Sequence, residues 1–99
     1  TIPTEVGNFV SCFEFRMSQN RLTGTIPTEV GNMVPCLLFS VSQNELNGTI
    51  PTEFGNLRGT TALDLGMNQL SGAVPSELSN LVSLTALVVQ ENEGLSDSL

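Results

Sequence analysis

Apolar and polar residues alternate over short stretches that recur along the chain every 24 positions. Leu63-Asp64-Leu65 is one such stretch, and Phe15-Arg16-Met17 and Phe39-Ser40-Val41 occupy the same place in the earlier periods. Alternation of this kind predicts a short strand with one buried face. Each period is therefore expected to contribute one short strand to a sheet.

Residues suited to turns follow each predicted strand. An Asn comes first, an apolar residue lies two positions later, and a Gly follows, as in Asn44, Leu46 and Gly48. Asn can satisfy backbone groups where a chain turns, and Gly accepts a left-handed backbone conformation. An Ile-Pro or Val-Pro pair then fixes an extended segment. Apolar residues three positions apart, such as Phe54 and Leu57, predict a short helical or 3₁₀ return.

Longer stretches of sequence repeat with the same period. Thr-Ile-Pro-Thr-Glu-Val-Gly-Asn at residues 1–8 returns at 25–32, with Phe in place of Val at 49–56, and in a looser form at 73–80. A single coil of this kind buries almost nothing, whereas stacked coils form a continuous core. We predict one domain, residues 1–99, made of about four repeats near 1–24, 25–48, 49–72 and 73–99.

The period resembles the plant-type leucine-rich repeat (LRR) of receptor-like proteins, whose motif reads Leu-x-x-Leu-x-Leu-x-x-Asn-x-Leu-x-Gly-x-Ile-Pro. The third copy matches this motif at Leu63, Leu65, Asn68, Leu70 and Gly72. The resemblance implies an α/β solenoid, a right-handed coil with a short parallel β-sheet on its concave face. It also implies loops and 3₁₀ turns on the convex side.

The chain departs from the motif at several places. The first Leu of the motif is replaced by Cys12, Cys36 and Thr60, so we expect the core to be under-filled in that column. One residue is inserted before Leu95. The chain starts and stops within a repeat without a polar cap, which favours an excerpt from a longer array and a marginally stable isolated chain. A short or misassigned gene product is the alternative.

Composition excludes several classes of function. Ten Asp and Glu against three Arg give a net charge of −7, which disfavours binding to nucleic acid or to an anionic membrane surface. The absence of His and Lys removes the usual general bases and the commonest metal-binding nitrogen. We therefore predict no catalysis by this segment, no cofactor and no metal. A kinase domain elsewhere in a parent protein stays possible.

The candidate ligand-binding residues are the outward positions of the predicted concave strands and the positions just after them. They differ from repeat to repeat, whereas the turn residues recur, as expected when a scaffold is fixed and a recognition surface is not. Their mixture of apolar and polar side chains is typical of surfaces that bind proteins or peptides. The candidates are Glu14, Arg16, Ser18, Gln19, Leu38, Ser40, Ser42, Gln43, Ala62, Asp64, Met67, Val88, Gln90 and Glu91.

Two columns of asparagine recur with the period. We expect the side-chain amides of the first column, which follows the strands, to hydrogen-bond the backbone of neighbouring coils. The second column is expected to do the same at the opposite corner. The first column is Asn20, Asn44, Asn68 and Asn92, and the second is Asn8, Asn32, Asn56 and Asn80.

Three further features have alternative interpretations. A column of glutamates is expected to form a solvated edge rather than a calcium or acid–base site. Cys12 and Cys36 lie one repeat apart, within disulfide range on neighbouring strands, and two buried thiols are the alternative. Asn47-Gly48-Thr49 is a glycosylation sequon on the turn side, away from the concave sheet. The glutamates are Glu5, Glu29, Glu53 and Glu77.

These observations favour a non-catalytic module that recognises a protein or peptide. The resemblance implies an extracellular or membrane-bound receptor-like parent, in which this segment contacts neighbouring repeats of the same chain and not the membrane. A structural spacer within an LRR array and an intracellular LRR adaptor are alternatives. Ice-surface binding is a further alternative, because Thr1, Thr25 and Thr49 form a regular column.

Overall fold

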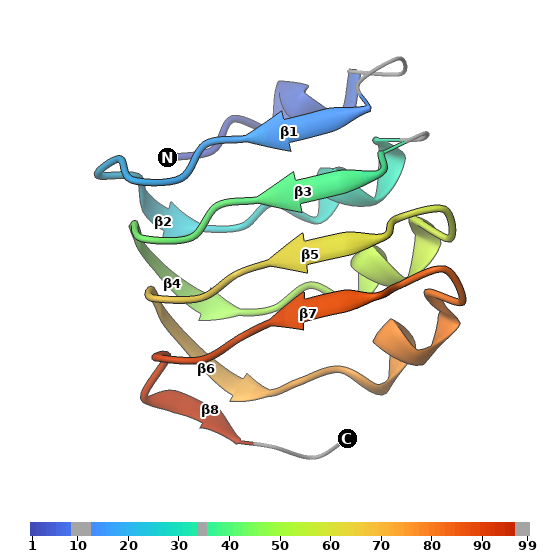
Figure 1. Cartoon of the computed structure of the whole chain (residues 1–99). Helices are drawn as coiled ribbons and strands as arrows, with labels where there is room; N and C mark the ends of the chain where they lie inside the picture. The colour runs from blue at the N-terminus through green and yellow to red at the C-terminus, as the bar shows by residue number, and fades with distance from the viewer. Residues whose placement is uncertain (9–12, 34–35, 97–99) are drawn as a thin grey trace.

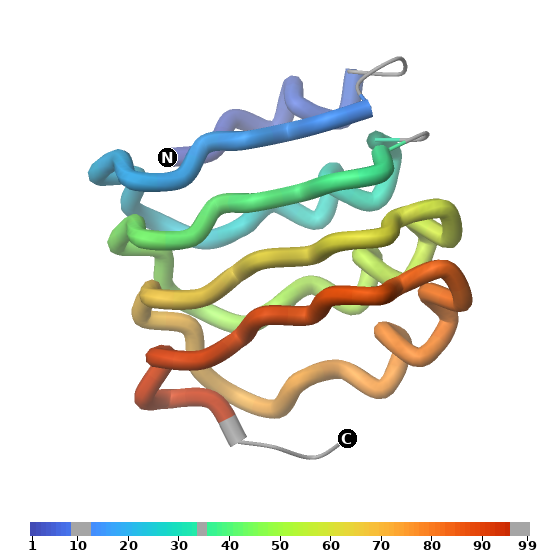
Figure 2. Tube along the Cα trace, in the orientation of Figure 1, coloured from blue at the N-terminus to red at the C-terminus, as the bar shows by residue number. Residues whose placement is uncertain are grey.

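The chain folds into a stack of coils that runs in a right-handed sense from one end of the molecule to the other (Figure 2). The computed structural model describes residues 1–8, 13–33 and 36–96. Each coil places a strand in a front sheet, a strand in a back sheet and a 3₁₀ helix (Figure 1). The 24-residue period of the sequence thus corresponds to one turn of a solenoid, as expected.

The front sheet contains the strands that the alternating pattern predicts. It consists of β1 (Glu14–Arg16), β3 (Leu38–Ser40), β5 (Ala62–Asp64) and β7 (Ala86–Val88), parallel and in that order. Phe15 pairs with Phe39, and Phe39 pairs with Leu63, so the register equals the sequence period. These central residues point inward, and the Phe15 and Phe39 rings stack with centroids 5.0 Å apart.

The back sheet was not predicted. It consists of β2 (Thr23–Thr25), β4 (Glu45–Thr49), β6 (Gln69–Ala73) and β8 (Gly94–Ser96), where the sequence indicated only a turn and an extended segment. Its strands pair with a stagger, since Gly24 faces Leu46 rather than Gly48. The pattern misses these strands because β4 and β6 each hold a single buried residue, Leu46 and Leu70, and β2 holds none, so no alternation results.

The back-sheet glycines are required for two reasons. Gly48 has φ of 78°, in the left-handed region that glycine tolerates best. A Cβ at Gly48 would also lie 2.8 Å from the Cγ2 of Thr25 in the preceding coil. The predicted left-handed turn is therefore confirmed, and it coincides with a close approach between coils.

The 3₁₀ helices form the third side of each coil, as predicted. They are η1 (Thr4–Asn8), η2 (Thr28–Asn32), η3 (Thr52–Asn56) and η4 (Ser76–Asn80). An extended proline precedes η3, since Pro51 has φ of −62° and ψ of 136°. The helices stack through their glycines, because a Cβ on Gly31 would lie 2.8 Å from the carbonyl oxygen of Glu53. Glycine at this position therefore sets the spacing between coils.

The core is a single apolar column enclosed by the three sides. Phe39, Val41, Leu46, Phe54 and Leu65 are each fully buried. Thr60 stands where the motif has Leu, and it too is fully buried, with its hydroxyl donating to the carbonyl of Cys36. A hydrogen bond thus takes the place of an apolar contact in the column that we expected to be under-filled.

Of the two cysteines, Cys36 lies within the described residues. Cys36 is buried, and its Sγ lies 3.3 Å from the carbonyl oxygen of Leu38, as expected for a core thiol. Cys12 lies outside the described residues. The alternatives of a disulfide and two buried thiols therefore stay as the sequence left them.

Three members of the first asparagine column confirm its predicted role, whereas Asn20 is exposed and, within the described residues, bonds only Met17 and Ser18 of its own coil. The Nδ2 of Asn68 donates to the carbonyl oxygens of Val41 at 3.0 Å, Leu65 at 3.3 Å and Gly66 at 3.0 Å. Its Oδ1 accepts the backbone N–H of Leu46 at 3.1 Å. Asn44 and Asn92 make the same set of contacts one coil before and one coil after. One buried amide therefore joins two coils.

The prediction for the second asparagine column is wrong. Asn8, Asn32, Asn56 and Asn80 are exposed, and within the described residues their side chains make no hydrogen bond to a neighbouring coil. The close contact at this corner is made instead by glycine against the glutamate of the next coil, with Gly7 packing on Glu29 and Gly31 on Glu53. The coils at this corner need no bridging asparagine side chain, because glycine lets the backbones of neighbouring coils pack directly against each other.

The two asparagine columns provide a matched test of this difference. We expect Asn68→Ala to lower the free energy of unfolding by about 3 kcal/mol, because it leaves buried carbonyl and N–H groups without partners. Asn56→Ala should change it by less than about 0.5 kcal/mol, since the side chain is exposed. Urea unfolding followed by circular dichroism measures both. Equal losses for the two variants would contradict the assignment.

Candidate ligand-binding face

The outward positions of the front sheet form two rows across the coils. Glu14, Leu38 and Ala62 are neighbours in one row. Arg16, Ser40, Asp64 and Val88 are neighbours in the other. Parallel strands lie about 4.8 Å apart, so residues in a row are close enough to contact one ligand together. The structure therefore brings these seven predicted site residues onto one face.

The residues that follow the strands have a different arrangement. Gln19, Gln43, Met67 and Glu91 all have positive φ, between 57° and 62°. The left-handed conformation is unfavourable for residues other than glycine, and each of these residues directly precedes an asparagine of the bonded column. These four side chains lie at the exit edge of the front sheet, where the chain turns away, and all four are exposed.

Two serines of the predicted set behave differently from each other. Ser18 is half-buried, whereas Ser42 is only 9% exposed. The Oγ of Ser42 lies 3.4 Å from the Oγ of Ser40. Ser42 is therefore a correction to the predicted site, because a side chain this deeply buried leaves a ligand little surface to contact. Gln90 occupies the same position of the repeat two coils after Ser42, and it is exposed.

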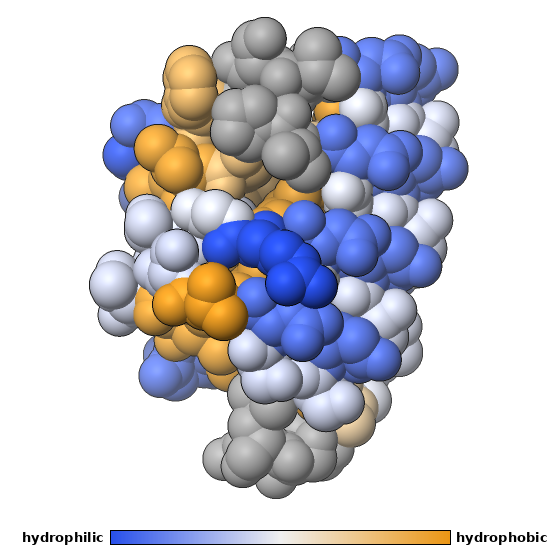
Figure 3. Space-filling view, turned by 90° about the vertical axis from the view of Figure 1, so that its right-hand side faces the viewer, coloured by the Kyte–Doolittle hydropathy of each residue, from blue (hydrophilic) through white to orange (hydrophobic). Residues whose placement is uncertain are grey.

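A further apolar position was missed. Phe13 is 58% exposed and Leu37 is 43% exposed, and both precede the strands by one residue. The backbone ladder extends to them, since the N–H of Leu37 donates to the carbonyl of Phe13 at 2.8 Å. Figure 3 shows hydrophobic residues gathered toward the front-sheet side, beside hydrophilic residues that recur over the 3₁₀ helices. The signal available in the sequence was that Phe13 and Leu37 are both apolar and occupy the same position of the repeat.

Charged groups on the front face are few and unevenly placed. The Nε of Arg16 lies 3.1 Å from the Oε1 of Glu14, and both side chains are well exposed. Asp64 accepts the N–H of Gly66 at 3.1 Å through its Oδ1. In residues 1–8, 13–33 and 36–96, no group of three potential metal-ligating side chains converges.

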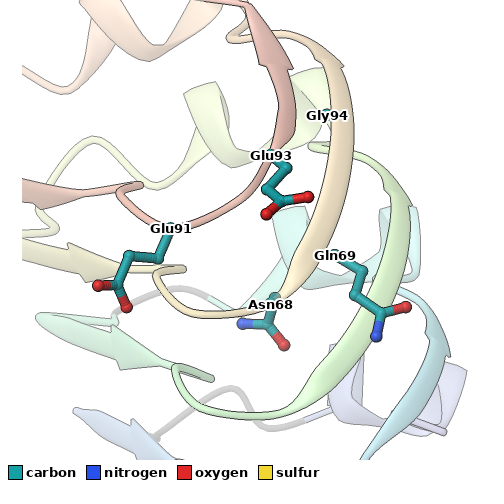
Figure 4. A pocket seen from close by; sticks show the side chains of 5 residues that line it. All are labelled: Asn68, Gln69, Glu91, Glu93 and Gly94. Carbon is teal, nitrogen blue, oxygen red and sulfur yellow. The ribbon is translucent and has the colours of Figure 1, made fainter.

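A polar hollow lies at the exit edge between the last two coils. It has a volume of about 390 Å³ and is lined by Asn68, Gln69, Glu91, Glu93 and Gly94. Figure 4 shows the carboxylates of Glu91 and Glu93 on the turn between β7 and β8, beside Asn68 and Gln69 of the preceding turn. We call this the exit hollow. Of its lining residues, only Glu91 was among the predicted site residues.

The glutamate column and the sequon lie away from the front sheet. Each 3₁₀ helix carries one of these glutamates in its first turn, and Glu29 and Glu53 are half-buried by the coil stacking described above. They line an edge and no described hollow. Asn47 is exposed on β4 of the back sheet.

A second, apolar hollow lies at the first coil. It measures about 300 Å³ and is lined by Ile2, Val6, Phe15, Met17 and Leu22, together with Thr1 and Pro3. These are the inward positions of the coil, so this hollow belongs to the stacking surface and not to the front face. No helix among the described residues is long and apolar enough to cross a membrane.

Comparisons with known proteins agree with this architecture. The family described as Leucine Rich Repeat matches residues 11–33, 38–57 and 60–81. No curated protein sequence matches the chain significantly. Most of the chain is nevertheless covered by the family match, and the matched segments follow the coils of the structure.

Three solved plant structures illustrate the similarity. The LRR ectodomain of the Arabidopsis thaliana receptor kinase GASSHO1/SCHENGEN3, in complex with CASPARIAN STRIP INTEGRITY FACTOR 2, superimposes with a TM-score of 0.91 and 37% identity over 92% of this chain and 11% of that chain. The ectodomain of the Arabidopsis receptor kinase HAESA, bound to a peptide hormone, gives 0.84 and 28% over 96% and 16%. A plant ice-binding protein gives 0.88 and 33% over 92% and 30%. The chain thus spans about a tenth of the first receptor ectodomain.

Proposed function

This chain belongs to the leucine-rich-repeat family, and we propose on that premise that its front sheet binds a protein or peptide ligand. The observation that carries the proposal is a contrast between the outward residues of the front sheet, which differ from coil to coil, and the asparagine column, which does not. Arg16, Ser40, Asp64 and Val88 occupy one row with four different chemistries, while the asparagine column beside them is the same in every coil. Fold requirements do not explain this variety, and ligand recognition does.

The proposal extends to the setting of the segment. Ectodomains of plant membrane receptors that resemble this chain were solved with ligands, one of them a peptide hormone. We infer an extracellular or membrane-associated parent protein, with neighbouring repeats stacked on these coils. The segment acts by recognition, and its chemistry gives no support to catalysis, since the sequence lacks His and Lys.

The ice-binding alternative receives less support from the geometry. A lattice-matching surface needs threonines in straight, regular rows. The stagger of the back sheet places Thr25 opposite Asn47, and Thr49 opposite Ser71. The threonine column of the sequence therefore runs obliquely across the back strands, and along the pairing direction Thr25 is followed by Asn47 and then by Gln69. We expect no thermal hysteresis from this chain, and a clear hysteresis gap in an ice-growth assay would favour this alternative over ligand recognition.

Substitution by tryptophan at two matched alanines tests the front sheet. Peptides are first selected from a random display library against the 99-residue chain, and their affinity is measured by fluorescence anisotropy. Ala62 is at the centre of the front sheet, and Ala73 is exposed on the back sheet. We expect Ala62→Trp to weaken binding at least about tenfold by steric block, a loss of roughly 1.4 kcal/mol. Ala73→Trp should leave it nearly unchanged.

The outcomes separate recognition from the spacer alternative. Circular dichroism of both variants checks that the fold is retained. If no peptide is selected, or if Ala73→Trp weakens binding as much as Ala62→Trp, the front sheet is not the binding face. The spacer interpretation would then be preferred.

The sequon gives an independent prediction about the secretory setting. Asn47 and Thr49 are both exposed on β4, so an oligosaccharide can be attached without contacting the front sheet. Expressed with a secretion signal in plant cells, the chain should gain the mass of one N-glycan. Asn47→Gln should abolish the gain, and Asn56→Gln should not. An unmodified secreted chain would contradict the assignment of Asn47.

A further inference from the structure

We propose that the ligand of the front sheet is a cationic segment, an extended peptide whose Lys or Arg side chain binds in the exit hollow that Glu91 and Glu93 line. This inference rests on the proposed function and specifies the ligand chemistry. The distribution of charge, the groups that line the hollow and the apolar residues between the hollow and the sheet support it.

Negative charge is concentrated at one end of the face. The described charges near the front sheet in the last two coils are Asp64, Glu91 and Glu93, and no described Arg lies within ion-pair distance of them. Arg16 is held by Glu14 at the first coil. Arg58 follows η3, on the side of the coil where the front strands begin. A ligand that crosses the face therefore meets uncompensated carboxylates at the end nearest the last coil.

The groups in the exit hollow favour a hydrogen-bond donor. The amide of Asn68 is already occupied, because it bonds four backbone groups of its own and the preceding coil. The carboxylates of Glu91 and Glu93 and the amide of Gln69 remain available to a ligand. Either carboxylate can accept hydrogen bonds from an ammonium or guanidinium group, and both repel a carboxylate or phosphate. Two are also too few for a calcium site.

Apolar residues connect the hollow to the front sheet. Met67 is 47% exposed and Val88 is 38% exposed. The N–H of Met67 donates to the carbonyl of Gln90 at 2.9 Å, which places Met67 beside the turn that carries Glu91. Long cationic side chains bury their methylene stems on apolar surface while the charged head reaches polar groups. Met67 and Val88 provide that surface between the sheet and the carboxylates.

The sequence itself supplies substitutions that preserve the fold. Glu91 occupies the column of Gln19 and Gln43, which share its left-handed backbone. Glu93 occupies the column of Gln69. The double variant Glu91→Gln/Glu93→Gln therefore places residues that other coils already accept. Its matched control is Glu5→Gln/Glu77→Gln, which removes two exposed carboxylates from the 3₁₀ edge.

The experiment uses the peptide selection described above and the same 99-residue chain. We expect Lys and Arg to be enriched in the selected peptides over the starting library. The best peptide should bind Glu91→Gln/Glu93→Gln about tenfold more weakly than the unmodified chain, as expected for the loss of two ion pairs at a partly exposed site. It should bind the control with less than about a twofold change. Replacing its Lys or Arg by a neutral residue should abolish the difference between the variants.

Each outcome has a distinct meaning. Peptides that need the front sheet, shown by the effect of Ala62→Trp, but that lack basic residues or ignore Glu91→Gln/Glu93→Gln would overturn this inference and leave the proposed function intact. Equal weakening by the test and control variants would assign the effect to overall charge and would also overturn the role of the exit hollow. Failure to select any peptide would overturn both proposals.

Discussion

The hydrogen bonds of the buried asparagine amide hold this structure together at the point where each coil leaves the front sheet. The chain must reverse there, and reversal leaves backbone carbonyls without strand partners in a buried place. The side-chain amide of Asn44 satisfies these groups by donating to the carbonyl oxygens of Met17, Val41 and Ser42. A buried carbonyl without a partner costs a free energy that a small domain cannot spare. The rest of the coil is arranged around this requirement.

The stagger of the back sheet follows from the same contact. The Oδ1 of Asn44 accepts the N–H of Leu22, and the two residues are 22 positions apart. The back strands β2, β4 and β6 pair with the same offset, as Gly24 faces Leu46, whereas the front strands keep the 24-residue period, as Phe15 faces Phe39. The amide therefore lies where the register changes. Glycine in the back strands and in the 3₁₀ helices then allows the sheared coils to approach closely.

The sequence predicts what depends on residues within one coil. Alternation located the front strands, and the asparagine, glycine and proline positions located the turns, because each of these signals acts over a few neighbouring residues. The back sheet, the burial of Ser42 and the exposure of Asn56 depend instead on which residues of two coils face each other. A period of 24 in the sequence gives no indication of a 22-residue register in space. The exit hollow escaped prediction for the same reason, since Gln69 and Glu93 belong to different coils.

Satisfying the backbone through buried amides has a consequence for the face that meets a ligand. The asparagine column and the backbone hydrogen bonds of the two sheets hold the coils together. The outward side chains of the front sheet therefore contribute little to the stability of the fold. The side-chain pairs described above among them are local, Glu14 with Arg16 and Ser40 with Ser42. Residues in such positions can change without unfolding the stack. Folding therefore does not require the carboxylates of the last coil, which agrees with the cationic ligand that we propose for them.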